Sequence, residues 1–212
     1  MILSTISADA FKKFADAIEG GQSPQEVAQE ALKKHSKVIF NGDNYCEDNQ
    51  AMLTERGLWR LDSAVEAIGL YDSEKNIKLF SDMGVLQEDE CKARKTVMLE
   101  HYVGTVEMEA LVMIDLINQH VIPSCKKGGV GPLAALGAAV VTLKKDLAAI
   151  HASDDEMKKA ELARVLRLET MVDLRVHCDA AEAVVPAADW TLATYKELLF
   201  LDQHEVGGLD AE

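Results

Sequence analysis

The chain has 212 residues and a formal net charge of -14, from 22 Lys and Arg against 36 Asp and Glu. This acidic balance argues against nucleic acids and anionic membranes as partners, because phosphate groups are bound by clusters of basic side chains. A hydrophobic fraction of 48% and a charged fraction of 27% are ordinary for a globular protein with a buried core. The aromatic fraction of 5% and the many Ala, Leu, Glu and Lys residues favour helices.

The cysteines and the N-terminus indicate a reducing compartment. Cys46, Cys91, Cys125 and Cys178 lie far apart, without a Cys-x-x-Cys pair, so they predict neither a zinc site nor a disulfide framework. The first residues lack the basic and long apolar regions of a signal peptide, and Asp9 and the absence of Arg argue against a transit peptide. The longest uncharged apolar run, GGVGPLAALGAAVVTL, has a helical part well short of the ~20 residues that span a bilayer. We expect a protein of the cytoplasm or the plastid stroma that does not span a membrane.

Two helices are predicted at the N-terminus. The first covers residues 4–19 and ends at a Gly-Gly pair. The second begins with Ser23 as N-cap and Pro24 in the first helical position, and it runs to about Lys37. One face of the first helix is apolar and carries Ile6, Ala10, Phe14 and Ala17.

The stretch HSKVIFNGDNYCEDN, residues 35–49, is predicted to be a short extended segment followed by a turn. Asn41-Gly42 and Asp43-Asn44 are turn formers, and we expect Phe40 and Tyr45 to anchor the turn against the helical bundle. Residues 47–82 read as short helices, and glycines interrupt this irregular middle of the chain. The stretch KNIKLFSDMGV predicts one or two amphipathic turns that end in a Gly cap.

Three long helices are predicted from about Gln87 onward, and they should pack as an antiparallel bundle because the connections between them are short. The first helix has apolar residues alternately four and three apart, and Pro123 followed by Gly128-Gly129 ends it. The third has an acidic first turn and stops near Pro186. The expected core positions are Leu99, Val103, Val106, Ala110, Met113, Ile117 and Val121 in the first helix, Leu136, Val140, Leu143, Leu147 and Ile150 in the second, and Leu162, Leu166, Val172, Val176 and Ala183 in the third.

The predicted fold class is therefore all-α, an antiparallel helical bundle built on three long helices. We expect residues 1–86 to form short helices with an extended and turn junction. Residues 87–203 should form the bundle and a C-terminal docking helix within DWTLATYKELLFLD, and residues 204–212 a flexible tail. The whole is expected to be one compact unit.

No motif in the chain predicts catalysis. The stretch KKGGVGPLAALG, residues 126–137, lacks the Gly-Lys-Ser/Thr ending of a phosphate loop and reads as a turn between helices. Glu169, Asp173 and His177 share a helix edge, but no Glu-x-x-His is present to complete a di-iron bundle site, which favours a solvated face. Glu107 and Glu109 lie on different faces, so they are not a paired acid and base.

The histidines also predict no site. None lies beside a Ser or Cys in a nucleophile arrangement, and His101 reads as a core or surface residue. The six positions are His35, His101, His120, His151, His177 and His204. We therefore assign no catalytic, cofactor-binding or metal-ligating residue and expect no cofactor. The residues favour a helical interaction or support module.

Several stretches together resemble the C-terminal region of type III glutamine synthetases. They are LKKHSKVIFNGDNY, TERGLWRL, EKNIKLFSDMGVL and LEHYVGTVEMEALVMIDLINQHVIP, in this order. STISADAFKKFADAIE is similar to the helix that follows the last catalytic strand in that family, and TYKELLF to its closing motif. The resemblance covers nearly the whole chain.

This resemblance implies a helical elaboration of a large ring-shaped oligomer. In the family, a β-rich core that precedes this region handles ATP, ammonia, glutamate and the metal ions, so no catalytic residue is carried over. The chain departs from the usual family sequence at three positions: Cys46, where Ser is customary, Asn49, where an aromatic residue is expected, and Glu107, where Asn is usual. The segment that leads into the closing motif is proline-rich in the family, whereas here it reads ADWTLATYKELLF. These changes suggest drift from the constraints of the parent enzyme.

Three functions fit these expectations. The first is a non-catalytic scaffold that binds other proteins in a larger assembly, motivated by the Met at the position where a catalytic core would end. The second is the C-terminal support domain of an active glutamine synthetase, whose ATP-dependent ligation of glutamate and ammonia is carried out by a core outside this chain. The third is a regulator of that enzyme acting in trans. The expected partners are proteins, with glutamine synthetase itself or a plastid complex as candidates.

Overall fold

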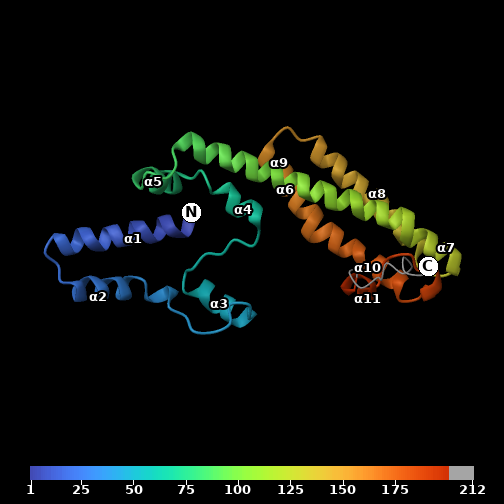
Figure 1. Cartoon of the computed structure of the whole chain (residues 1–212), viewed down its shortest axis with the longest axis horizontal. Helices are drawn as coiled ribbons and strands as arrows, with labels where there is room; N and C mark the ends of the chain where they lie inside the picture. The colour runs from blue at the N-terminus through green and yellow to red at the C-terminus, as the bar shows by residue number, and fades with distance from the viewer. Residues whose placement is uncertain (201–212) are drawn as a thin grey trace, which may run out of the picture. The chain divides into compact units, whose positions relative to one another are not determined.

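The computed structural model describes residues 1–200, and the regular structure within that range is entirely helical (Figure 1). The prediction of an all-α fold is confirmed. The chain divides into two compact units, Met1–Leu99 and Glu100–Glu212, and the division falls inside one helix. The expected domain boundary at residue 86 stays a prediction, and the expected tail at 204–212 lies outside the described residues. In the described part of the chain, no helix is long and apolar enough to cross a membrane.

The N-terminal unit consists of short helices and the beginning of a long one. They are α1 (Ile2–Glu19), α2 (Pro24–Lys34), a 3-10 turn (Ser36–Val38), α3 (Glu47–Glu55), α4 (Ala64–Gly69), α5 (Glu74–Asp82) and the first part of α6 (Glu88–Leu116). Ser23 caps α2 as predicted: its Oγ accepts the Glu26 N–H at 3.2 Å, and Glu26 Oε2 accepts the Ser23 N–H at 2.9 Å. These hydrogen bonds favour the ionised carboxylate, so the pKa of Glu26 lies below its ordinary value.

The interior of the N-terminal unit is small. Phe80, Leu86 and Cys91 form a buried cluster, and Tyr71 stacks on Phe80 with the ring centroids 5.7 Å apart. The predicted Gly cap of α5 is confirmed, since Gly84 has φ +65° and the Val85 N–H donates to Phe80 O at 2.8 Å. The other buried apolar residues of this unit are Val27, Val65 and Leu99.

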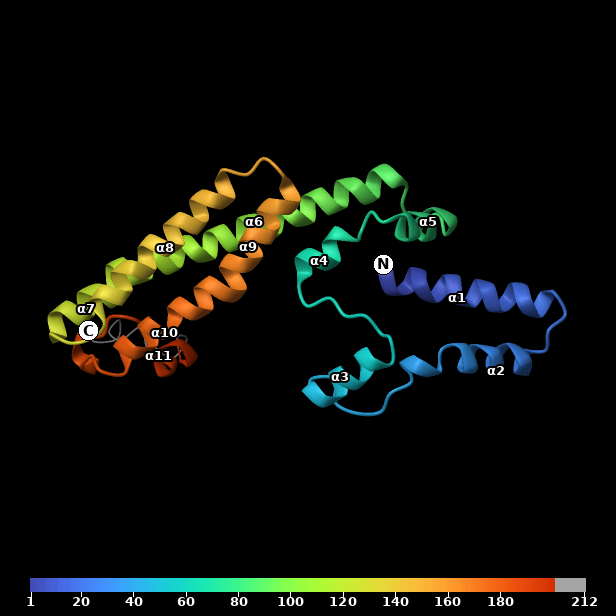
Figure 2. The ribbon, with the colours of Figure 1, turned by 180° about the vertical axis from the view of Figure 1, so that it is seen from behind.

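The C-terminal unit is the predicted antiparallel bundle. Its elements are the rest of α6, a π-helical turn η2 (Ile117–Val121), α7 (Ile122–Gly128), α8 (Leu133–His151), α9 (Glu156–Val165), a second π-helical turn η3 (Leu166–Thr170), α10 (Met171–Glu182), a 3-10 turn (Ala187–Asp189) and α11 (Tyr195–Leu199). Figures 1 and 2 show α8 and α10 running beside the C-terminal part of α6. The predicted seams of the first and second helices are confirmed: Leu99 is buried in the N-terminal unit, and the other residues belong to one core or pack against it, together with Ile114 and Ala139.

The first long helix does not end at Pro123, as the sequence had indicated, but continues to Gly128. Proline removes an N–H and clashes with the carbonyl of the preceding turn in a regular helix. Here η2 comes first, with the Ile122 N–H donating to Ile117 O five residues back. Pro123 therefore lies in the first turn of a new α-helical stretch, where proline is tolerated. Gly129, with φ +67°, ends the helix as predicted.

The predicted core positions Val172 and Val176 are wrong, because positions six and ten residues beyond Leu166 lie off its face of the helix, and η3 changes the phase further. The Met171 N–H donates to Leu166 O, which inserts one extra residue into the turn. The core is therefore contacted by Leu166, Met171, Leu174, Cys178 and Ala181. Val172 and Val176 are turned outward and are 58% and 61% exposed. Ala183, also expected in the core, is exposed.

Deletion of Glu169, an exposed residue of η3, should be tolerated. Loss of one residue converts the π turn into a regular α-helical turn without rotating α10 relative to α9. Deletion of the exposed Lys144 in α8 is the matched control, because it turns Leu147 and Ile150 away from the core by about 100°. We expect Tm to fall by only a few degrees for the first variant and by more than about 10 °C for the second, measured by circular dichroism. Equal losses would contradict this account of η3.

Candidate interaction surfaces

The apolar face of α1 points to solvent. Leu3 and Phe11 are 81% and 71% exposed, although α1 contacts α2 and α5. The side of α1 that is buried carries Thr5, whose Oγ1 donates to Met1 O at 3.0 Å. We call the exposed apolar residues of this helix the α1 surface: Ile2, Leu3, Ile6, Phe11, Phe14 and Ile18. Scattered apolar side chains on a surface are ordinary, and what distinguishes α1 is that six large ones are exposed on a single helix.

The junction of residues 35–49 forms the predicted turn, but Tyr45 does not anchor it. The turn is held by its own polar groups: the Tyr45 N–H donates to Asp43 Oδ1 at 2.8 Å, and Asn49 Nδ2 donates to Asp43 O at 3.0 Å. Because these bonds fix the backbone, the Tyr45 side chain is left 90% exposed. Phe40 is half-buried and lies so close to Gly42 that an added Cβ there would clash with its ring.

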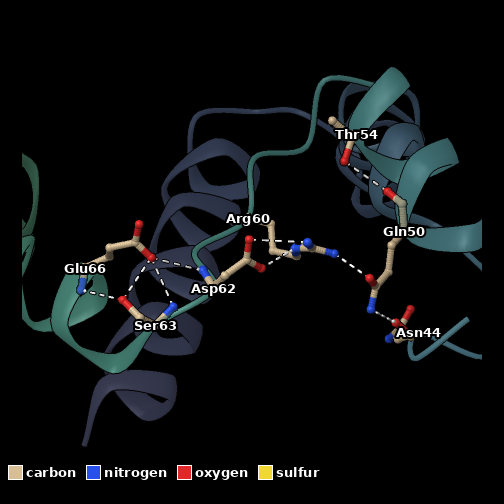
Figure 3. Close-up of polar contacts among 7 residues, drawn as sticks. All are labelled: Asn44, Gln50, Thr54, Arg60, Asp62, Ser63 and Glu66. Carbon is tan, nitrogen blue, oxygen red and sulfur yellow. Dashed lines mark hydrogen bonds and ion pairs between the residues drawn. The ribbon is translucent and has the colours of Figure 1, made fainter. Parts of the chain in front are cut away.

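A polar network links this turn to the segment before α4 (Figure 3). Gln50 Nε2 donates to Asn44 O at 2.8 Å, and Gln50 Oε1 accepts a hydrogen bond from Arg60, which also forms an ion pair with Asp62. Ser63 and Glu66 then form the capping box of α4. All these groups are exposed or half-buried at the surface. We interpret the network as structural: it holds the backbone of the loop in place.

Large apolar side chains are also exposed in the loop and in the segment after α3, and we call them together the junction surface: Val38, Ile39, Tyr45 and Trp59. Trp59 directly precedes Arg60, so the network fixes the backbone next to it. Exposed aromatic side chains on a fixed backbone are typical of the residues that contribute most to protein–protein binding.

A groove runs along the C-terminal unit between α6–η2 and η3–α10. It has a volume of about 690 Å³, and residues 190–198 close one end. Ile117 and Val121 form its floor. Arg167 crosses from η3 to α6, with its Nε 3.0 Å from Glu109 Oε2, and its guanidinium lies 6.0 Å from the centre of the Tyr102 ring.

Polar contacts hold residues 189–191 against η2 and α7. His120 Nδ1 lies 2.9 Å from Thr191 Oγ1, and Lys127 Nζ lies 2.8 Å from Asp189 Oδ1. Trp190 and Leu192 pack against the core of the bundle. The segment that follows contains α11, a short helix at the position of the predicted docking helix, and its residues are exposed.

The candidate site residues do not converge. Glu169 lies 3.4 Å from Arg164, and Asp173 is exposed. Glu107 and Glu109 do not form a carboxylate pair, because they have different partners. Glu107 Oε1 lies 2.8 Å from His151 Nε2, whereas Glu109 pairs with Arg167. Within residues 126–137, the turn between helices covers only 129–132, because α7 continues to Gly128 and α8 begins at Leu133. Within residues 1–200 no group of three His, Cys, Asp or Glu side chains is placed to hold a metal ion.

The cysteines are free thiols. Cys91 and Cys125 are fully buried, and burial raises the pKa of both thiols. Burial also raises the pKa of Cys178, which lines the groove. The thiolate is the reactive form of cysteine, and a raised pKa lowers its population. We therefore interpret these three cysteines as packing residues.

The sequence comparisons identify the relatives of the chain. Residues 24–128 match the family model of the glutamine synthetase C-terminal domain. The chain is 27% identical over 241 aligned residues to the type-3 glutamine synthetase of Dictyostelium discoideum, an alignment that covers 95% of this chain and 33% of that protein. It is 25% identical over 227 residues to the glutamine synthetase of Butyrivibrio fibrisolvens, covering 93% of this chain and 31% of that protein.

A glutamine synthetase of Bacteroides fragilis is 21% identical over 232 residues, covering 93% of this chain and 32% of that protein. The chain thus spans about a third of the length of the curated relatives it matches. The predicted resemblance is confirmed: by sequence, this chain is similar along nearly its whole length to type-3 glutamine synthetases, and residues 24–128 match the C-terminal domain of that enzyme family.

Proposed function

We propose that the chain is a helical interaction module that packs the α1 surface and the junction surface against another protein in a larger assembly. The observation that carries this proposal is the outward orientation of the apolar stripe on α1. Leu3, Ile6 and Phe14 lie on one face of that helix and are all exposed. The opposite, polar side carries the ion pairs of Lys12 with Asp16 and of Lys13 with Asp9.

The energetics of the N-terminal unit support this proposal. An apolar side chain of this size gains about 1.5–3 kcal/mol when it is removed from water. The unit leaves more large apolar side chains on its surface than it buries, and α1 alone exposes six of them. A partner that covered α1 would recover part of that free energy, less the cost of association. Such a surface is therefore better explained by contact with a protein than by solvation.

A second function is favoured by the extent of the sequence match. Since 95% of this chain aligns with a third of a type-3 glutamine synthetase, the chain would serve as the support region of such an enzyme. The ATP-dependent ligation of glutamate and ammonia would then take place in a core outside these residues. In that arrangement the α1 surface would pack on the core. Addition of the chain to a purified relative, with activity as the readout, tests the related idea of a regulator in trans.

The intact mass of the native, untagged polypeptide from its source distinguishes these two functions. A mass near 23.2 kDa together with a stoichiometric partner protein would support the interaction module, because the apolar surfaces would then be covered by another protein. The measurement is native mass spectrometry followed by denaturing mass spectrometry of the same sample. A much larger polypeptide would favour the support region, and a bare monomer at cellular concentration would contradict the interaction module.

The double substitution Leu3→Ser and Phe11→Ser should remove the partner without unfolding the chain. Both side chains are exposed, so their loss costs little in the free protein. In the assembly, two buried apolar contacts disappear, and we expect at least about a tenfold loss of affinity. The measurement is the size of the complex formed by the variant in its source cells, alongside a thermal melt of the purified variant.

Val141→Ser together with Val184→Ser is the matched control, since both residues are exposed in the other unit. The control should leave the complex intact. If the α1 variant assembled as well as the control, the α1 surface would not be the contact.

A further inference from the structure

The groove of the C-terminal unit has walls that an apolar helix would fit. Val112 and Leu116 expose their side chains on the α6 wall, and Val172 on the α10 wall. Met113 and Met171 lie half-buried between them, and methionine adapts its shape to different apolar partners. The three long helices form three sides of a bundle, so a helix lying between α6 and α10 would complete a four-helix arrangement.

The charge of the groove selects the kind of helix. Its charged lining residues are Glu109, Arg167, Arg175, Asp179 and Glu182. Each arginine already has a carboxylate partner: Arg167 contacts Glu109 at 3.0 Å, and Arg175 contacts Asp179 at 3.4 Å. These two pairs are neutral, so the carboxylate of Glu182 determines the sign of the groove.

The α6–η2 wall of the groove contains no Lys or Arg, since neither occurs between Lys95 and Lys126. Trp190 lines the groove together with Glu182, and both also line the smaller cavity beside it. A carboxylate next to an indole ring attracts a Lys or Arg side chain by ion pairing and by a cation–π interaction.

We propose that this groove binds a basic amphipathic helix of another protein, with its apolar side chains between α6 and α10 and a cationic side chain at Glu182 and Trp190. This binding site lies in a different unit from the α1 surface, and it does not rest on the function proposed above. The partner is identified by its chemistry: apolar residues at helical spacing with Lys or Arg on the flanks.

The test uses a synthetic helix of about 18 Leu and Lys residues, with Leu at positions i, i+3, i+4 and i+7. The full-length chain carries Trp59→Phe, so Trp190 is its remaining tryptophan and reports on the groove. We expect saturable binding with a shift in Trp190 emission, and a loss of affinity of at least about tenfold between low and high salt. A peptide with Glu in place of every Lys should bind at least about tenfold more weakly.

Two matched substitutions locate the binding. Val172→Lys places a positive charge in the groove, whereas Val141→Lys places the same charge on an exposed part of α8 that does not line it. We expect the first to weaken binding about tenfold or more and the second by less than about twofold. Glu182→Gln should weaken binding severalfold, whereas Glu161→Gln, at an exposed position on α9, should not.

Four results would overturn the proposal. Equal losses for Val172→Lys and Val141→Lys would mean attraction to the acidic surface as a whole. Equal affinity for the acidic peptide would mean an apolar site without charge selection. A dimer in sedimentation that Val172→Lys dissociates, without peptide binding, would mean that a second copy fills the groove. Binding that occurs only after removal of residues 201–212 would mean that this segment is the occupant.

Discussion

The hydrogen bond from the Met171 N–H to Leu166 O determines how the third long helix meets the bundle. It spans five residues instead of four, and the extra residue rotates everything that follows. Met171, Leu174 and Cys178 are thereby turned toward the core. Val172 is turned outward, where it becomes one wall of the groove. With a regular helical turn at this point, each core position would be taken by the preceding residue: Thr170, Asp173 and His177 would face the core, and Met171, Leu174 and Cys178 would lie on the groove side.

The first long helix also contains a π-helical turn, η2, which there accommodates a proline. Pro123 would break a regular helix, yet Cys125, two residues after it, is still helical and lies in the core. The five-residue hydrogen bond to Ile117 O places the proline at the beginning of α7 and keeps the helix axis continuous through it. Ile117 and Val121 of this turn then form the floor of the groove. Both π turns thus contribute to the same concave surface, which is where such turns are often found.

The sequence predicted most reliably the elements whose periodicity is uninterrupted. The α8 seam was correct at every position, because its Leu, Val and Ile residues repeat at helical spacing along the whole helix without a break in phase. The phase of α10 could not be predicted, since Met171 and Val172 are both apolar and neither marks the π turn. The apolar face of α1 was predicted, but its exposure was not, because a pattern specifies which face is apolar and not what covers it. Tyr45 was misplaced since its mass suggested burial, whereas the turn is held by Asp43.

The two exposed surfaces differ in charge, and this difference bears on what the chain would assemble. On α1 four of the five charged side chains form pairs, Lys12 with Asp16 and Lys13 with Asp9, and helical spacing places the fifth, Glu19, on the side away from Leu3, Ile6 and Phe14. Recognition there would depend on apolar contact and be nearly insensitive to salt. At the groove, Glu182 leaves a negative charge beside apolar walls. Surfaces so different would select partners of different chemistry, and a module with one of each would join two unlike proteins more readily than copies of itself.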